Sequence, residues 1–218
     1  MLLLKIKQKV VEYGEKIVKE GLVVATWGNI SARNGHDDVF VITPSGMSYT
    51  ILEPDDIVEV DINGNPLSPG RKPSVETPMH AAIYRARPDV RAIIHTHSTN
   101  ACACAVARMD IPCIMEDMAC MVGGPVKVAD YAPTGSQELA RNVVKALGDR
   151  NAVLLANHGV VTVGRDLEEA FKLSLLVEKS AEIFIKAKLI RFPFSLNESE
   201  VQFLRNFYRT SYGQGDKK

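Results

Sequence analysis

The sequence predicts a single α/β domain with a mixed sheet over residues 1–218. Segments whose apolar residues recur at helical spacing alternate along the chain with short apolar runs, which are typical of buried strands. A chain of 218 residues is long enough to enclose one sizeable hydrophobic core. We find no internal repeat, low-complexity tract or interdomain linker that would divide the chain, so one domain is the economical interpretation.

The first part of the chain predicts a helix followed by strands and turns. Residues 5–20 place apolar side chains at helical spacing, and Gly21 is a natural C-terminal stop. Residues 27–31 predict a tight turn into a strand, and residues 39–42 predict a second strand that ends at a Thr-Pro-Ser-Gly turn. Residues 61–66 contain Asn-Gly, which is a turn signal of a β-hairpin.

The middle of the chain predicts a helix, a strand and another helix. Ser74 is placed to cap a helix that runs to Pro88, with Glu76 in its first turn. The apolar run at residues 90–94 predicts a buried strand. The small residues at 98–107 predict a helix after it.

The last part of the chain is dominated by helices. Residues 111–133 are punctuated by proline and glycine and predict no clear element. Residues 136–147 predict a helix, and residues 152–163 predict a strand, a turn and a strand. Residues 167–190 predict one long helix, and the residues from 191 onward predict a short helix and a polar tail.

The composition excludes several classes of protein. Hydrophobic residues make up 46% of the chain and charged residues 24%, and Lys plus Arg equals Asp plus Glu at 26 each. A basic surface for nucleic acid is therefore not expected. No stretch approaches the roughly 20 apolar residues of a transmembrane helix, and the apolar start at residues 1–4 is too short for a secretory leader. We therefore expect a cytoplasmic protein that binds neither nucleic acid nor membranes.

Four cysteines lie in one stretch of the sequence, without a Cys-x-x-Cys pair: Cys102, Cys104, Cys113 and Cys120. In a cytoplasmic protein these side chains are expected to be free thiols that behave as small buried hydrophobes. An additional metal or redox site is the alternative that the sequence leaves open.

Three histidines predict a metal site. His95 and His97 end the apolar run at residues 90–94, and side chains two apart along a strand share one face. A His-x-His pair alone is weak evidence, because buried histidines bonded to the backbone are common. His158 follows a second apolar run, in a turn where a side chain can project into a cleft. Three histidines with an open fourth position are typical of a catalytic zinc site.

Glycine turns and one glutamate are further candidates. Turns at Gly28-Asn29, Ser45-Gly46 and Ser74-Val75 can hold a phosphate with backbone N–H groups and hydroxyls, although each alone is also an ordinary structural turn. Glu76 is a helix-stabilising carboxylate, a general base or a fourth metal ligand, and its spacing does not choose among these roles. His80 faces the same side of the helix as Glu76 and is expected to have a core or supporting role, whereas His36 is expected in a solvated loop.

Five ordered segments resemble the class II aldolase and adducin-head family: residues 28–31, 42–46, 73–76, 95–97 and 157–159. The resemblance covers nearly the whole chain. It implies a three-layer α/β/α fold with a largely antiparallel mixed sheet, and a homotetramer with active sites at the subunit interfaces. It also implies a zinc ion, or Mn²⁺ or Co²⁺ in its place, because three imidazoles accept all of these metals.

The same resemblance assigns roles to individual residues. It implies that His95, His97 and His158 bind the metal, that Glu76 is the catalytic residue and approaches the metal in an empty site, and that Tyr212 is a second catalytic residue contributed by a neighbouring subunit. It places the substrate phosphate at Gly28, Asn29, Ser45, Gly46, Ser74 and Val75. Val75 stands where the aldolase often has a second serine. Glu116 stands where the aldolase has a tyrosine, and Asp117 keeps an epimerase as an alternative.

The function predicted in this way is a metal-dependent aldolase, which is a lyase of carbohydrate metabolism. It would cleave a ketose 1-phosphate reversibly into dihydroxyacetone phosphate and an aldehyde, and the substrate would be L-fuculose 1-phosphate or a related pentulose or deoxypentulose 1-phosphate. The alternatives are a pentulose-5-phosphate 4-epimerase and a methylthioribulose-1-phosphate dehydratase. A non-enzymatic module like the adducin head is disfavoured, because all three histidines and Glu76 are present.

Overall fold

A seven-stranded sheet forms the middle layer, in the order β3-β2-β1-β4-β7-β6-β5. The computed structural model describes residues 2–35 and 38–211. The strands are β1 (Asn29–Arg33), β2 (Val39–Ile42), β3 (Val58–Asp61), β4 (Ala92–Thr96), β5 (Lys127–Ala129), β6 (Ala152–Leu155) and β7 (Gly159–Gly164). Strands β5 and β6 pair in parallel, and the other neighbouring pairs are antiparallel.

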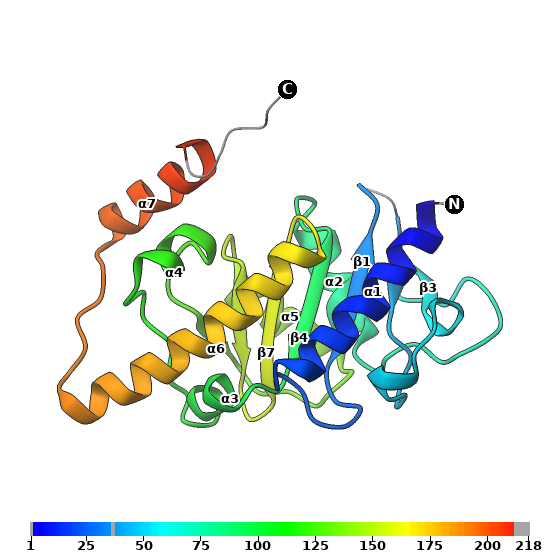
Figure 1. Ribbon diagram of the computed structural model, residues 1–218, viewed down its shortest axis with the longest axis horizontal. Helices are drawn as coiled ribbons and strands as arrows, with labels where there is room; N and C mark the ends of the chain where they lie inside the picture. The colour runs from blue at the N-terminus through cyan, green and yellow to red at the C-terminus, as the bar shows by residue number, and fades with distance from the viewer. Residues whose placement is uncertain (1, 36–37, 212–218) are drawn as a thin grey trace.

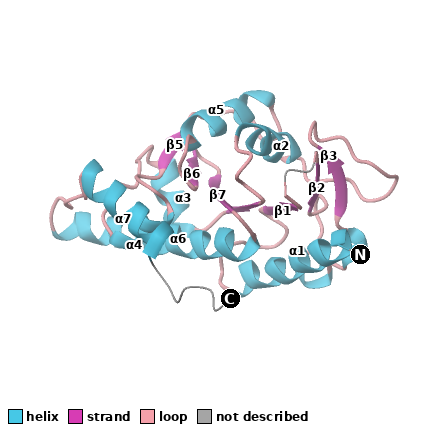
Figure 2. Cartoon of the chain, turned by 90° about the horizontal axis from the view of Figure 1, so that it is seen from above, coloured by secondary structure: helices cyan, strands magenta, loops and turns pink. Residues whose placement is uncertain are grey.

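Helices cover both faces of this sheet (Figures 1 and 2). They are α1 (Leu2–Lys19), α2 (Thr77–Ala86), α3 (Thr99–Val106), α4 (Glu116–Met121), α5 (Gln137–Leu147), α6 (Leu167–Ile190) and α7 (Glu198–Ser211), with short 3₁₀ turns at Tyr49–Ile51 and Pro54–Asp56. Helices α2 and α5 lie on one face, and α1, α3 and α6 lie on the other. The predicted three-layer α/β/α fold with a largely antiparallel mixed sheet is confirmed.

The apolar core is divided by the sheet. On one face, Met79 and Ile83 of α2 pack with Phe40 and Val161 of the strands. On the other face, apolar residues of α1, α3 and α6 cover the sheet in two adjoining clusters. Strand β4 is the middle strand of the order and is buried along its whole length. A side chain at its C-terminal end is therefore held between two packed layers.

Several predicted elements agree with the structure. The long helix has the predicted bounds, Leu167–Ile190, because Asp166 caps its first turn by accepting a hydrogen bond from the N–H of Glu169 at 2.8 Å. Strand β2 also has its predicted bounds. Ser136 caps α5 through the N–H of Leu139, at 3.0 Å.

The turn predicted at residues 61–66 is present: the N–H of Asp61 donates to the carbonyl of Asn65 at 2.9 Å, and Pro66 pairs with Val60 in an antiparallel bridge. The returning arm makes only this bridge and is not a strand. One local prediction was wrong. Ser74 does not cap α2. Helix α2 begins at Thr77, with Glu76 as its N-cap residue, and the hydroxyl of Ser74 instead accepts a hydrogen bond from the N–H of Glu76 at 3.2 Å.

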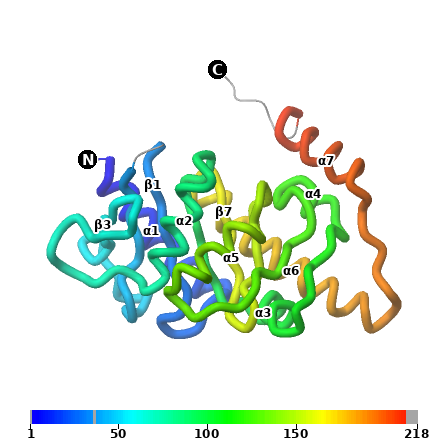
Figure 3. Tube along the Cα trace, turned by 180° about the vertical axis from the view of Figure 1, so that it is seen from behind, coloured from blue at the N-terminus to red at the C-terminus, as the bar shows by residue number. Residues whose placement is uncertain are grey.

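The segment at residues 111–133, for which no clear element was predicted, contains α4 and β5. Helix α4 has only six residues and lies against α7, which projects from the main body beside it (Figure 3). No helix within residues 2–35 and 38–211 combines the length and the apolar character that a membrane span requires.

Candidate metal centre and substrate cavity

Strand β4 and the residue that follows it position two of the three histidines. His95 is completely buried within the strand, opposite Val161 of β7. His97 lies just beyond the strand end, and its backbone N–H donates to the carbonyl of Leu22 at 3.1 Å. The His-x-His spacing therefore places both rings on one side of the chain, as the sequence predicts.

The hairpin between β6 and β7 positions the third histidine. His158 is the last residue of its three-residue turn, and Asn157 before it has a φ of 54°, a left-handed conformation that asparagine tolerates. Gly159 permits the close approach of this turn to β4. A Cβ atom at Gly159 would lie 2.5 Å from the carbonyl oxygen of Thr96 and 2.9 Å from ring carbons of both His95 and His97.

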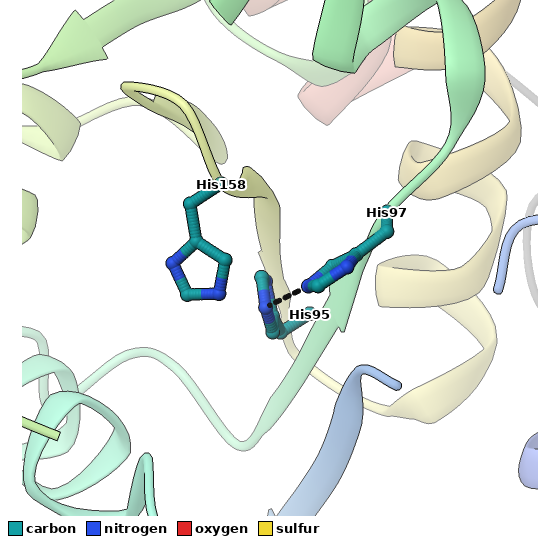
Figure 4. A group of neighbouring side chains, drawn as sticks. All are labelled: His95, His97 and His158. Atoms are coloured by element: carbon teal, nitrogen blue, oxygen red, sulfur yellow. Dashed lines mark hydrogen bonds between the residues drawn. The ribbon is translucent and has the colours of Figure 1, made fainter. Parts of the chain in front are cut away.

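The three imidazole rings converge on one point (Figure 4). Their ring centroids lie 4.8–5.1 Å apart, and one nitrogen from each ring lies within 4.8 Å of the other two. The Nε2 atoms of His95 and His97 are 3.0 Å apart. This is the arrangement of three ligands of one small ion.

The tautomer of His95 follows from its neighbours. Its Nδ1 lies 3.0 Å from the carbonyl oxygen of Val160, and a carbonyl only accepts, so Nδ1 carries the proton. The other nitrogen, Nε2, faces Glu76 Oε2 at 3.1 Å. A bare nitrogen lone pair against a carboxylate is repulsive, so this contact requires a proton or a metal cation at Nε2.

Glu76 faces the histidines from the start of α2. Its Oε2 accepts a hydrogen bond from Asn29 Nδ2 at 2.8 Å, and its Oε1 lies 3.5 Å from His158 Nε2. Among the described residues, no group donates a hydrogen bond to this buried Oε1. Burial opposes ionisation of the carboxyl, but His95, His158 and the Asn29 amide outweigh burial and lower the pKa of Glu76.

The pKa values of the three histidines shift in different directions in these surroundings. Burial and the neighbouring His95 and His158 lower the pKa of His97 to about 3. Burial and His95 lower the pKa of His158 to about 4. Burial also disfavours charge on His95, but the carboxylate of Glu76 outweighs it and raises the pKa of His95. His97 and His158 are therefore neutral at physiological pH, which is the form that binds metal.

The residues present fit a divalent metal ion. The donor set is three imidazoles, one of which has its tautomer fixed by a backbone carbonyl, as is usual for metal-bound histidine. The buried Oε1 of Glu76, which lies 3.5 Å from His158 Nε2 and accepts no hydrogen bond from the described residues, adds a negative group beside them. This set is borderline in softness, which suits zinc and also manganese and cobalt.

A cavity of about 460 Å³ opens beside the histidines. Its walls include every residue that was assigned to phosphate binding from the sequence: Gly28, Asn29, Ser45, Gly46, Ser74 and Val75. A bridge between Pro44 and Pro73 joins the two serine-containing loops. Glu76, His97 and His158 line the same cavity. The structure therefore brings the predicted phosphate-binding turns and the histidine cluster to one site.

The residues of the two loops differ in the hydrogen-bond donors that they can offer to an anion. At the bridge, the backbone N–H of Ser45 donates to the carbonyl oxygen of Lys72 at 2.9 Å. The backbone N–H of Ser74 donates to the carbonyl oxygen of Thr43 at 3.1 Å. These residues therefore have only their hydroxyls to offer. Among the described residues, nothing accepts a hydrogen bond from the N–H of Gly46 or Val75. Val75 thus lacks a hydroxyl but keeps a backbone donor at the cavity.

Some cavity residues were not found from the sequence, among them Trp27, Tyr131 and Thr134. Trp27 is the single tryptophan of the chain, next to the first glycine turn, and its ring lies 5.5 Å from that of His97. The position of this tryptophan beside Gly28 is the sequence signal that could have identified it. Tyr131 and Thr134 follow β5, a strand that the sequence did not reveal.

Other candidates lie apart from this cavity. Glu116 and Asp117 begin α4 and do not line the cavity. Tyr212 and His36 lie outside the described residues. His80 is completely buried behind Glu76 and Asn29.

Comparison with known proteins places the chain in a family. Residues 8–185 match the family described as Class II Aldolase and Adducin N-terminal domain. The chain belongs to the class II aldolase and adducin family. One relative in this family, a 5-deoxy-D-ribulose 1-phosphate aldolase of Bacillus thuringiensis, is 36% identical over 98% of this chain and 100% of its own. The L-fuculose phosphate aldolase of Escherichia coli K12 is 32% identical over 96% of each chain.

Solved structures of class II aldolases have the same fold. A structure described as L-fuculose 1-phosphate aldolase superposes with a TM-score of 0.91 at 38% identity and covers 94% of this chain and 96% of its own. An L-fuculose-1-phosphate aldolase from Thermus thermophilus gives a TM-score of 0.74 at 30% identity, over 87% of this chain and 96% of its own.

Proposed function

We propose that this class II aldolase cleaves a ketose 1-phosphate reversibly into dihydroxyacetone phosphate and an aldehyde. The observation that carries the proposal is the shared cavity. It has hydroxyl and N–H donors for a phosphate, and it also has the carboxylate of Glu76 beside three converging imidazoles. Relatives named for 5-deoxyribulose 1-phosphate and for L-fuculose phosphate make a deoxypentulose and a deoxyhexulose 1-phosphate the first substrates to test.

The phosphate would lie against the two bridged loops. The hydroxyls of Ser45 and Ser74 and the N–H groups of Gly46 and Val75 are the donors that we assign to it. Gly28 closes the cavity nearby with a φ of 78°, and a Cβ there would lie 2.6 Å from the carbonyl oxygen of His95. Anchoring the phosphate in this way orients the ketose toward the histidines and Glu76.

Glu76 would move the proton. Cleavage of the C3–C4 bond takes the proton of the C4 hydroxyl and leaves a carbanion at C3 that is delocalised as an enediolate. An acid group must then deliver a proton to C3 before product is released, and its conjugate base removes the same proton in the reverse reaction. We assign this role to Oε1 of Glu76, because Oε2 is already held by Asn29 and faces His95. We assign the second proton transfer, at the cleaved hydroxyl, to Tyr212 of a neighbouring subunit.

His95, His97 and His158 would hold a divalent ion, with Glu76 as a further ligand when no substrate is bound. The chemistry such an ion supplies is that of a Lewis acid for the negative charge of the enediolate. We propose zinc first, and manganese or cobalt as replacements. A cytoplasmic location agrees with the four cysteines, none of which is in a disulfide within the described part of the chain.

A coupled assay for dihydroxyacetone phosphate tests the proposal. The panel consists of L-fuculose 1-phosphate, 5-deoxyribulose 1-phosphate and 5-methylthioribulose 1-phosphate, each with chelator and with zinc or manganese restored. We expect metal-dependent release from at least one substrate. Absence of release from all three, with metal at full occupancy, would contradict the proposal and favour an epimerase or a dehydratase.

Glu76→Gln tests the assigned base. Glutamine keeps the size of the side chain and removes its proton affinity, so we expect turnover to fall about a hundredfold or more with metal still bound. Glu12→Gln, at an exposed ion pair with Lys16 on α1, is the matched control and should keep normal turnover. Normal turnover of Glu76→Gln would remove Glu76 from the mechanism.

We also propose that the chain forms a homotetramer with its active sites at the subunit interfaces. Large apolar side chains are exposed at the end of α6, in the following segment and on α7: Leu189, Ile190, Phe192, Phe194, Phe203 and Phe207. Patches of this kind mark association surfaces. Glu116 lies on the neighbouring α4 and away from its own cavity, which suits a contribution to another subunit.

Analytical ultracentrifugation tests the assembly. We expect a particle of four times the chain mass of 23.9 kDa. Replacing Phe192 and Phe194 together by serine should weaken association, whereas replacing exposed Leu2 at the other end of the molecule should not. A monomeric wild-type protein with full activity would contradict the interface proposal.

A further inference from the structure

A chain of polar side chains is buried between β1 and α2, behind Glu76. We call it the polar seam: Asn29 and Ser31 of β1, with Glu76, the N-cap residue of α2, and His80 and Tyr84 within α2. The two strand residues are two apart, and Glu76, His80 and Tyr84 follow one another at intervals of four, so each set lies on one side of its element. Ser31 and His80 are completely buried, and Glu76 is only 4% exposed.

Short contacts connect the polar seam from end to end. The hydroxyl of Tyr84 lies 2.8 Å from Ser31 Oγ, which lies 2.6 Å from His80 Nδ1. His80 Nε2 lies 2.6 Å from Asn29 Oδ1. Asn29 Nδ2 then donates to Glu76 Oε2 at 2.8 Å. All of these contacts occur within an otherwise apolar layer that includes Met79.

The direction of donation along the polar seam follows from its acceptor end. A carboxylate only accepts, so the Asn29 amide presents Nδ2 to Glu76 and Oδ1 to His80. His80 must therefore donate from Nε2. Burial lowers the pKa of His80 to about 3, so its ring is neutral and Nδ1 accepts from Ser31. The Ser31 oxygen in turn accepts from Tyr84.

The polar seam also distinguishes the two carboxylate oxygens of Glu76. Oε2 is held by Asn29 at 2.8 Å and faces His95 at 3.1 Å. Oε1 has no hydrogen-bond donor within the described residues and points toward His158. If the Asn29 amide rotated by half a turn, its oxygen would face Oε2 and repel it, and the carboxylate would no longer be fixed in this orientation.

We propose that His80 is a positioning residue that locks the Asn29 amide, and that Ser31 and Tyr84 hold the His80 ring in place. Through Asn29 the polar seam holds Oε2 of Glu76 and leaves Oε1 as the oxygen that faces the substrate. His80 does not line the cavity, so it acts only through Asn29. This inference rests on the proposed function, because it takes Glu76 as the proton-transferring group.

The first test reads the tautomer and needs no activity. Nitrogen-15 NMR of histidine-labelled, zinc-loaded protein at pH 7, with His80 assigned by its loss in His80→Gln, should show the Nε2–H form alone. In Ser31→Ala the Nε2–H form should persist, because Asn29 Oδ1 still accepts its proton. A His80 that carries its proton on Nδ1, or on both nitrogens, would overturn the proposed direction of the polar seam.

The second test separates positioning from folding. His80→Leu removes both hydrogen-bonding nitrogens, and we expect kcat to fall roughly tenfold or more with KM changed less than about twofold. His80→Gln keeps a donor near the Nε2 position and should stay within about threefold of wild type. Met79→Leu, a neighbouring buried residue outside the polar seam, is the control and should keep wild-type kcat.

The outcomes distinguish the positioning role of His80 from the proposed aldolase function. Equal losses of kcat in His80→Leu and His80→Gln, or no loss in His80→Leu, would overturn the positioning role. If His80→Leu does not fold, a tenfold or larger fall of kcat in His80→Gln, which keeps the donor, would overturn it as well. A wild-type enzyme without aldol cleavage would contradict the proposed function, and the NMR result would still decide the arrangement of the polar seam.

Discussion

Gly159→Ala is a sharp perturbation of the histidine cluster, because the new methyl group would enter the space beside His95 and His97, two of the proposed metal ligands. Its carbon would lie 2.5 Å from the carbonyl oxygen of Thr96, a backbone atom in the middle of the sheet. It would also lie 2.9 Å from His95 Cε1 and from His97 Cδ2. Real Cβ contacts are not shorter than 3.0 Å, so β7 and β4 must separate by about half an ångström.

The expected magnitude follows from these contacts. Overpacking of this kind costs about 1–3 kcal/mol of unfolding free energy. Shifts in groups that orient metal ligands typically lower metal affinity roughly 10- to 100-fold, and the rings of both His95 and His97 are contacted here. We therefore expect zinc affinity, measured by competition with a chromogenic chelator, to fall about a hundredfold. Urea unfolding of the metal-free protein gives the stability change separately.

Gly164→Ala is the matched control on the same strand. Its Cβ would lie 2.7 Å from the N of Ala170 and 3.0 Å from the carbonyl oxygen of Asp166, at the end of β7 away from the histidines. This variant should lose a similar amount of unfolding free energy and keep wild-type zinc affinity. If Gly159→Ala loses stability as Gly164→Ala does but binds zinc normally, close backbone approach does not shape the metal centre.

Three further perturbations have defined outcomes. Glu178 accepts hydrogen bonds from the first N–H groups of α3, at 2.9 and 3.0 Å, so Glu178→Ala should lower the unfolding free energy by about 2 kcal/mol in a urea titration; an unchanged midpoint would contradict this. Burial raises the pKa of Cys102 and of Cys113 to about 11, so these thiols stay protonated below that pH. Their alkylation by iodoacetamide should be slow at pH 7 and rise about tenfold per pH unit up to pH 10, and a plateau near pH 8 would refute the shift. Ser45→Ala and Ser74→Ala each remove a hydroxyl from the phosphate end of the cavity and should raise KM about tenfold with little change in kcat; a ketose without phosphate, turned over at the same rate by both variants and wild type, is the control.

Local signals determined how much of the fold the sequence could predict. Helix α6 was predicted at both ends because its cap and its periodicity are encoded within the segment itself. Helix α4 and strand β5 were missed because each is short and flanked by proline or glycine, so packing against α7 and β6 rather than local preference defines them.

The candidate site, too, could be predicted only where the signal is local in the sequence. The histidines could be found because strand alternation places His95 and His97 together and a turn after an apolar run exposes His158. The error at Ser74 has a nonlocal cause. Ser74 belongs to a loop that is bridged to residues 43–46, and that pairing directs its hydroxyl to the N–H of Glu76 instead of to a helix end. The cavity residue Tyr131 was missed because its position depends on β5.

The unequal burial of the three histidines has a consequence for the kinetics of metal exchange. His95 lies in β4, the middle strand of the sheet, and is released only when the sheet itself opens. His158 lies on a three-residue turn at the cavity, and His97 lies beyond the strand end. We therefore expect an ion to enter and leave through motion of this turn, while His95 keeps its place. Exchange would then be uncoupled from unfolding, and we expect the apoprotein to be reloaded without passing through the denatured state.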